Sequence, residues 1–178
     1  FAKEIKVEVK YPESLNNDNE LKYIKNLCPD VVIVVAYGKI IPTKILNIQN
    51  INFINIHASI LPRWRGAAPI QRAILEMDNE TGISIMKIVP KLDAGPYMMQ
   101  EKVKIEKEDN YSSLSNKLSI LGSELILKSL KLIEEKNYKF IEQDENKIKY
   151  AKKIDKKESK INWDMPSRNI IAKINGLS

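Results

Sequence analysis

The spacing of the hydrophobic residues changes several times along the chain, and each change predicts a separate strand or helix. Ile5, Val7 and Val9 alternate with charged residues, which predicts a short strand with one face in water. The β-branched run at 31–35 has no polar interruption and predicts a strand buried on both faces, as in a parallel sheet covered by helices. Further strands are predicted at 51–56, at 82–89, at 97–105 and, near a sheet edge, at 147–152.

Helices are predicted where apolar residues recur every three or four positions between a cap and a breaker. The predicted helices cover 20–27, 41–47, 67–76, a long segment capped by Asp109 and Asn110, and 167–175. The apolar stripe of the long helix consists of Leu114, Leu118, Leu121, Leu125 and Ile133. Strands that alternate with helices indicate an open α/β sheet, in which ligands bind beyond the carboxyl ends of the strands.

The strand predicted at 51–56 runs into two polar side chains that are suited to chemistry. Because side chains alternate along a strand, Phe53, Asn55 and His57 share one face, which changes from apolar to polar at the carboxyl end. Asn55 can donate a hydrogen bond, and His57, the only histidine of the chain, can give or take a proton. A lone histidine is usually satisfied by a loop carbonyl, but the asparagine, the strand end and the rigid loop that follows favour a functional site.

A second polar candidate is Asp93, which lies 36 positions after His57 (93 − 57) in a loop with short flanking residues. An aspartate before Ala-Gly is often an Asx-turn residue, whose carboxylate bonds its own backbone. Alternatively, its carboxylate lies beside His57 and favours the charged form of the imidazole. The spacing alone does not decide between these two interpretations.

Several other catalytic classes lack their motifs in this chain. Ser59 is near His57, but there is no Gly-x-Ser-x-Gly turn, no phosphate-binding Gly-x-x-x-x-Gly-Lys and no Gly-x-Gly-x-x-Gly. Cys28 precedes the buried strand and is interpreted as a packing residue. Asn, His and Asp without a nucleophile suit direct attack of a substrate amine on a carbonyl, with the protein accepting a proton and stabilising the oxyanion.

Composition places the chain among globular proteins of about one domain. It has 178 residues, of which 43% are hydrophobic and 29% charged, and no apolar run approaches the ~20 residues of a membrane span. The start of the chain has no signal-peptide pattern. Its single cysteine allows no internal disulfide, which suits a reducing compartment, and one histidine with one cysteine argues against structural zinc. The formal charge of +6 indicates either a solvated lysine-rich surface or attraction to a polyanion such as RNA.

The motif Asn55-x-His57-x-Ser59-Ile60-Leu61-Pro62, followed by Asp93-x-Gly95, resembles the catalytic signature of the folate-dependent formyltransferases. Within this family, the segment 62–72 is most similar to the members that act on methionyl-tRNA, and 35–38, 81–82 and 161–163 match them too. The resemblance is good from about 29 to 105 and colinear to the end. Ile60 stands where leucine is usual, a near-isosteric change expected to be harmless.

The resemblance implies a formyl transfer from 10-formyltetrahydrofolate, with no metal, to the methionine amino group of initiator methionyl-tRNA. It implies that Asn55 and His57 polarise the formyl carbonyl and hold its oxyanion, and that Asp93 partners His57 and assists removal of the amine proton. The residues it assigns to the folate site are Ser59, Ile60, Leu61 and Pro62, together with Val35, Ala36, Tyr37, Gly38, Leu92 and Gly95 around the pterin ring.

The fold that the resemblance implies is a Rossmann-like, open and mostly parallel α/β sheet of the formyltransferase type, incomplete at the N-terminus. Residues 1–150 would be the later part of a catalytic domain, and 151–178 its end and the start of a linker toward a missing C-terminal domain. We expect a chain cut from something longer, monomeric, not associated with a membrane, and at work in a bacterial cytoplasm or an organelle.

Three alternatives remain at this point. The first is a sibling formyltransferase that acts on a nucleotide precursor or an amino sugar, against which the segment 63–70 favours the tRNA enzyme. The second is a non-catalytic basic RNA-binding fragment, whose affinity for RNA would depend on salt but not on Asp93. The third is a folate-binding hydrolase that releases formate without an amine acceptor.

Overall fold

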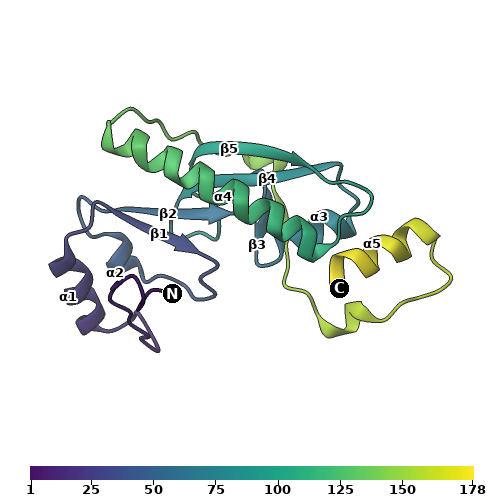
Figure 1. Cartoon of the computed structure of the whole chain (residues 1–178), viewed down its shortest axis with the longest axis horizontal. Coiled ribbons are helices and arrows are strands. Elements are labelled where there is room, and N and C mark those ends of the chain that lie inside the picture. The colour runs from purple at the N-terminus through teal and green to yellow at the C-terminus, as the bar shows by residue number, and fades with distance from the viewer.

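A computed structural model describes residues 1–178 as a four-stranded sheet, a two-stranded sheet and the helices around them (Figure 1). The helices are α1 (Asp18–Leu27), α2 (Thr43–Leu46), α3 (Pro69–Leu75), α4 (Tyr111–Glu134) and α5 (Ser167–Leu177), with the short 3-10 helices η1 (Glu145–Lys147) and η2 (Lys156–Ser159). The strands are β1 (Val31–Val35), β2 (Asn52–His57), β3 (Arg63–Gly66), β4 (Glu80–Lys87), β5 (Tyr97–Lys104) and β6 (Lys149–Ala151).

The larger sheet has the strand order β1-β2-β4-β5, which confirms the open α/β sheet that the pattern predicts. β1 and β2 are parallel, whereas β4 is antiparallel to both β2 and β5, so the sheet changes direction beside β2. The smaller sheet pairs β3 with β6 in parallel. β2 is therefore an inner strand, and its carboxyl end lies beside the end of β1.

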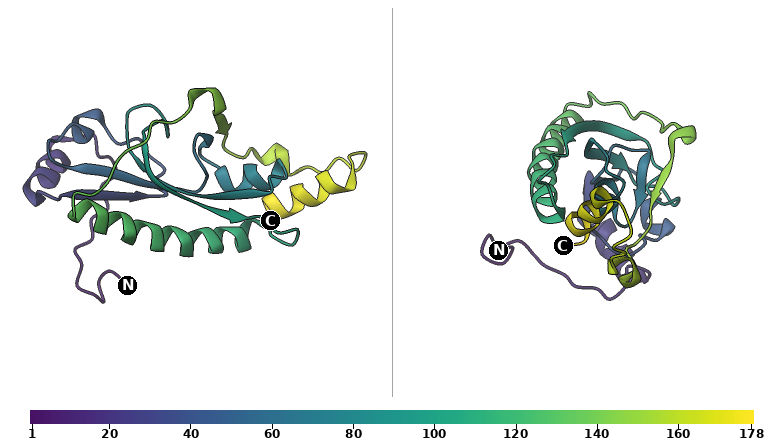
Figure 2. Two further views of the ribbon diagram at one scale, coloured as in Figure 1. Left: turned by 90° about the horizontal axis from the view of Figure 1, so that it is seen from above. Right: turned by 90° about the vertical axis from the view of Figure 1, so that its right-hand side faces the viewer.

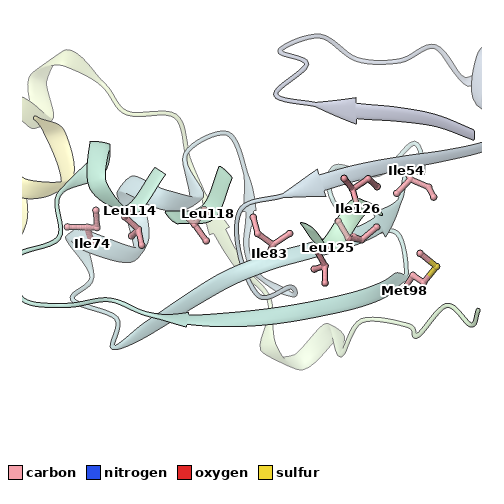
Figure 3. Packing of buried hydrophobic residues seen from close by; sticks show 9 residues of the cluster. Ile54, Ile74, Ile83, Met98, Leu114, Leu118, Leu125 and Ile126 are labelled. Atoms are coloured by element: carbon pink, nitrogen blue, oxygen red, sulfur yellow. The ribbon is translucent and has the colours of Figure 1, made fainter. Parts of the chain in front are cut away.

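The core lies between the larger sheet and α4, which runs along one face of that sheet (Figure 2). Asn110 caps this helix in a reciprocal arrangement with Ser113, as the sequence predicts for this position. Leu114, Leu118 and Leu125 of the predicted stripe are buried in one cluster with the sheet residues Ile54 and Ile83, and Leu114 lies beside Ile74 of α3 (Figure 3). The other two stripe residues, Leu121 and Ile133, are partly buried against the same cluster.

Three expectations for the first 35 residues are wrong. Cys28, interpreted as a packing residue, is exposed. The alternating segment at 5–9 forms no strand: residues 2–6 make turns, with Ile5 N–H donating to the Phe1 carbonyl, because no strand lies alongside to pair with it. The run 31–35 is a strand, but Ile33 is 41% and Val35 is 59% exposed. β1 is an edge strand, and α4 packs mainly over β4 and β5, so nothing in the chain covers both faces of β1.

The last part of the chain is fastened to α3. α5 packs against α3, and Arg72 of α3 holds the segment that leads to α5. The Arg72 guanidinium donates Nε–H to the Lys152 carbonyl (3.0 Å) and both Nη groups to the Glu158 carboxylate (2.6 and 2.9 Å). This hydrogen bonding lowers the pKa of Glu158 to about 2. None of the helices is both long enough and apolar enough to cross a membrane.

Truncation of a core leucine on α4 should lower the stability of the fold. Leu118→Ala removes a side chain that is 2% exposed, and a buried leucine truncated to alanine typically costs about 2–5 kcal/mol of the free energy of unfolding. Leu127→Ala on the same helix is the matched control, because Leu127 is 67% exposed. Urea denaturation measures both, and equal losses in the two variants would contradict this description of the core.

The contribution of Glu158 to stability should depend on pH. Because the pKa of Glu158 is lowered in the fold, its ion pair with Arg72 stabilises the protein above the ordinary carboxyl pKa and is lost as the pH falls toward about 2. We therefore expect Glu158→Gln to lower the free energy of unfolding at pH 7 and the difference from wild type to shrink between about pH 5 and pH 2. Urea titrations across this range test it, and a difference that stays constant would contradict it.

Candidate active site

The polar face at the end of β2 forms as the alternation of side chains predicts. His57 is the last residue of β2 and is buried, whereas Asn55 is partly exposed and its side chain makes no hydrogen bond within the chain. The parallel pairing aligns Val35 with Ile56, between the two polar residues. The amide of Asn55 is therefore free to bind a ligand at the adjoining ends of β1 and β2.

A β-bulge in β3 fixes the imidazole of His57. The register between β3 and β6 shifts between Arg63 and Arg65, and the residue between them, Trp64, has a left-handed backbone with φ of 68°. The Trp64 carbonyl lies 2.9 Å from Nε2 of His57. Because a carbonyl only accepts hydrogen bonds, Nε2 carries the proton that the neutral ring has, and the other nitrogen, Nδ1, is left to accept a proton.

Asp93 is brought to the other ring nitrogen of His57. Its Oδ2 lies 3.8 Å from Nδ1, and it accepts a hydrogen bond of 2.8 Å from the Gly66 amide. No backbone group of its own loop donates to this carboxylate, so it forms no Asx turn, and it lies beside His57, as the second interpretation expects. A protonated Nδ1 would face a carboxylate, which stabilises the positive charge.

The bulge itself is held by Asp78, which the sequence does not single out. Its carboxylate accepts hydrogen bonds from Nε1 of Trp64 (2.7 Å) and from Nε of Arg63 (2.9 Å), and the bond to Arg63 raises the pKa of that guanidinium. Arg63 and Lys149 also lie over the Trp64 ring, each 4.6 Å from its centre. The indole is therefore held at its N–H and by two cations over its ring, which helps to fix the backbone carbonyl that His57 uses.

The four residues from Ser59 to Pro62 differ in whether a ligand can reach them. Ile60, Leu61 and Pro62 line a cavity of about 1230 Å³ together with residues of β4 and β5. Ser59 is fully buried, and its hydroxyl donates to the Arg63 carbonyl at 2.6 Å. As a correction to the expected folate contacts, the Ser59 side chain is committed to shaping the loop. None of the polar trio Asn55, His57 and Asp93 lines this cavity.

The other residues expected at a pterin ring lie near the polar trio. Val35 ends β1 beside the end of β2, Ala36, Tyr37 and Gly38 follow it, and all four residues are exposed. Leu92 is exposed next to Asp93, whereas Gly95 is buried, and a Cβ there would lie 1.8 Å from the Lys87 carbonyl oxygen. These loops can therefore offer their backbone N–H and C=O groups to a ligand, whereas there is no free space around the Cα of Gly95. No three His, Cys, Asp or Glu side chains are grouped so as to hold a metal ion.

Sequence reasoning missed the residues that hold this site together. The segment at 63–66 is predicted as a loop, but it forms β3 because β6, more than 80 positions later, supplies its partner. Gly66 and Gln143 contact the Asp93 loop across large separations in sequence, for which periodicity gives no signal. The only pointer was the resemblance of the segment around Arg65 to a known family.

A sequence profile of the formyl transferase family matches residues 3–130, and the chain belongs to this family. Among curated relatives, the methionyl-tRNA formyltransferase of Pelagibacter ubique is 50% identical over 177 residues, which cover 99% of this chain and 57% of that protein. The methionyl-tRNA formyltransferase of Dictyoglomus thermophilum is 46% identical over 179 residues, again with 57% of its length covered. The chain thus spans somewhat more than half the length of these relatives.

Solved structures support the same fold. A sugar N-formyltransferase from Shewanella superposes with a TM-score of 0.79 at 23% identity, over 93% of this chain and 66% of that one. HypX from Aquifex aeolicus, solved in complex with tetrahydrofolic acid, gives a TM-score of 0.76 at 16% identity, over 88% of this chain and 27% of its own. At these identities the likeness shows the formyltransferase fold and nothing about the acceptor.

Proposed function

We propose that this chain carries the active site of an enzyme that transfers a formyl group from 10-formyltetrahydrofolate to the methionine amino group of initiator methionyl-tRNA. The observation that carries the proposal is the grouping of the free Asn55 amide, the His57 ring and the Asp93 carboxylate at one strand end. The 50% identity to a methionyl-tRNA formyltransferase over nearly the whole chain favours methionyl-tRNA as the acceptor.

The reaction needs only an amine, an activated formyl group and a route for one proton. The methionine nitrogen attacks the formyl carbon, a new C–N bond forms, and the carbonyl electrons move onto oxygen. Collapse of this oxyanion breaks the bond between the formyl carbon and N10 of the folate, and the proton lost by the amine ends on N10. The products are formylmethionyl-tRNA and tetrahydrofolate, with no oxidation or reduction.

Asn55 and His57 would stabilise the oxyanion. The Asn55 amide has no competing partner within the chain, so its N–H groups are available without breaking a bond. The Nε2–H of the His57 ring is donated to the Trp64 carbonyl, so the ring can donate to the oxyanion only through Nδ1, and only once Nδ1 is protonated. Donors that are already oriented stabilise developing charge without reorganising during the reaction.

Asp93 would accept the proton of the attacking amine. Its Oδ2 lies 3.8 Å from Nδ1 of His57, too far for a direct hydrogen bond and close enough for a strong Coulomb interaction with a protonated ring. The pair can therefore exchange a proton with a nitrogen that binds beside both groups. This arrangement suits the removal of a proton from the amine and its return to N10.

The folate would lie across the ends of β1 and β2, with its formyl group toward Asn55. The backbone around Val35–Gly38 and the loop from Leu92 to Gly95 would contact the pterin ring, and Ile60–Pro62 would contact the remainder of the folate. The formal charge of +6 supports a polyanionic partner such as tRNA. We further propose a monomer that works in a bacterial cytoplasm or an organelle, where initiator tRNA is formylated.

An amino sugar is the acceptor of the second candidate function, because the grouping of Asn55, His57 and Asp93 acts on an amine and a formyl group and so fits either acceptor. Both candidates use the same proposed chemistry at Asn55, His57 and Asp93, so mutation of the site cannot separate them. A direct comparison of acceptors can: product from methionyl-tRNA supports our assignment, and product only from an amino sugar would replace it.

Loss of the Asp93 charge should abolish most of the activity. Asp93→Asn keeps an oxygen for the Gly66 amide and removes the proton acceptor, so we expect formyl transfer to methionyl-tRNA to fall at least ~100-fold, the scale of general acid–base roles. The measurement is formyl transfer from 10-formyltetrahydrofolate by the protein at its full natural length. RNA affinity should stay within about 2-fold of wild type, since Asp93 is proposed to touch only the amine.

The matched control is Asp164→Ala, which removes an exposed aspartate that forms no ion pair. We expect this variant to keep wild-type activity. Equal activity of Asp93→Asn and wild type would rule out the assigned proton acceptor. Salt-sensitive RNA binding without any formyl transfer by the wild-type protein would favour the non-catalytic RNA-binding alternative, and formate release without an acceptor would favour the hydrolase.

A further inference from the structure

Gln143 lies 50 positions after Asp93 in the chain, and its side chain forms hydrogen bonds with the loop that carries Asp93. It lies in the segment that joins α4 to β6, and it is 7% exposed. Its side-chain amide donates one hydrogen bond to the Asp93 carbonyl (2.9 Å) and one to the Gly95 carbonyl (2.6 Å). Both N–H groups of the side chain are thus spent on this one loop, which is all the donating capacity that a glutamine has.

The loop that contains Asp93 has few stabilising hydrogen bonds of its own. Asp93 has a left-handed backbone with φ of 45°, which is unfavourable for a residue with a side chain and persists only where surrounding contacts enforce it. Within the loop itself, one backbone hydrogen bond of 3.3 Å joins Ala94 to Lys91. The contacts that orient Asp93 therefore come from outside the loop: the Gly66 amide on its carboxylate and Gln143 on its carbonyl.

Arg65 connects Gln143 to the strand that also fixes His57. The Arg65 side chain is fully buried, and its Nε–H donates to Oε1 of Gln143 at 2.9 Å. Its Nη2 donates to Glu145 at 2.8 Å, and this bond lowers the pKa of Glu145, which keeps a negative charge beside the guanidinium. The remaining nitrogen, Nη1, has no partner, so Gln143 and Glu145 provide all of the hydrogen bonding of this buried cation.

We propose that Gln143, oriented by Arg65, is a positioning residue that holds the Asp93 carboxylate at His57. The proposal rests on the proposed role of Asp93 in formyl transfer. Gln143 touches neither His57 nor the Asp93 carboxylate, so it acts through the loop backbone and not on the reacting atoms. It lies outside the apolar core cluster, and its side-chain hydrogen bonds go only to the loop and to Arg65.

The variant that separates this role from a general structural one is Gln143→Glu. A carboxylate keeps an acceptor for Arg65 and adds a charge that the guanidinium favours, but it places an oxygen against the Asp93 and Gly95 carbonyls in place of donors. We expect kcat for formyl transfer by the full-length protein to fall about 10- to 100-fold, the cost of displacing a catalytic group by about 1 Å. KM for both substrates should change less than about 3-fold, because Gln143 contacts neither.

Hydrogen exchange reports the position of the loop without depending on activity. The Gly66 amide is bonded to the Asp93 carboxylate, so it should exchange at least 10-fold faster in Gln143→Glu, whereas the amides of α4 should keep their wild-type rates. Leu118→Ala is the control, because it lowers the stability of the core without touching the loop. It should keep kcat close to wild type at a temperature at which both proteins are folded.

The outcomes distinguish the failure of this inference from the failure of the proposed function. Faster exchange at Gly66 together with a fall in kcat supports the positioning role. Wild-type kcat in Gln143→Glu, or unchanged exchange at Gly66, would overturn it, and either would mean that Gln143 serves Arg65 alone. A wild-type protein that makes no formylmethionyl-tRNA would instead reject the proposed function, and the exchange measurement would still decide whether Gln143 holds the loop.

Discussion

The β-bulge in β3 is the constraint on which the geometry of the site depends. Three consecutive residues of this strand each reach a different part of the site: Trp64 accepts a hydrogen bond from His57, Arg65 donates to Gln143, and Gly66 donates to Asp93. A regular strand would turn the Trp64 carbonyl into the ladder with β6 instead of toward the imidazole. Gly66, with φ of 123° and a Cβ position 2.7 Å from the Ala151 carbonyl oxygen, admits no side chain here.

The chain after α4 contributes to the geometry of the site as much as the segment from Asn55 to Pro62 does. β6 is the strand that makes β3 a strand, and the segment before β6 carries Gln143 and Glu145 into the site. Arg72 fastens the segment after β6 to α3 through Glu158. Residues 140–158 therefore support the geometry of the proposed site by holding β3 and the Asp93 loop together.

What the sequence could predict follows from the range of the interactions involved. The face shared by Asn55 and His57 depends only on the alternation along one strand, and the buried stripe of α4 only on helical spacing, so both were predictable. Whether β1 is buried and whether residues 5–9 form a strand depend on which segments pack beside them in space, and the local sequence pattern does not contain this information. The contacts of Asp93 with Gly66 and of Gln143 with Asp93 join positions 27 and 50 residues apart, which no periodicity connects.

The central claim is that Asn55, His57 and Asp93 form one site that receives the formyl group. A crystal structure of the full-length protein with 5-formyltetrahydrofolate, a stable analogue of the donor, tests it most directly. The account predicts the formyl oxygen at about 3 Å from the Asn55 amide or the His57 ring, the distance of a hydrogen bond. A formyl group bound in the cavity between Pro62 and β5, away from all three side chains, would contradict it.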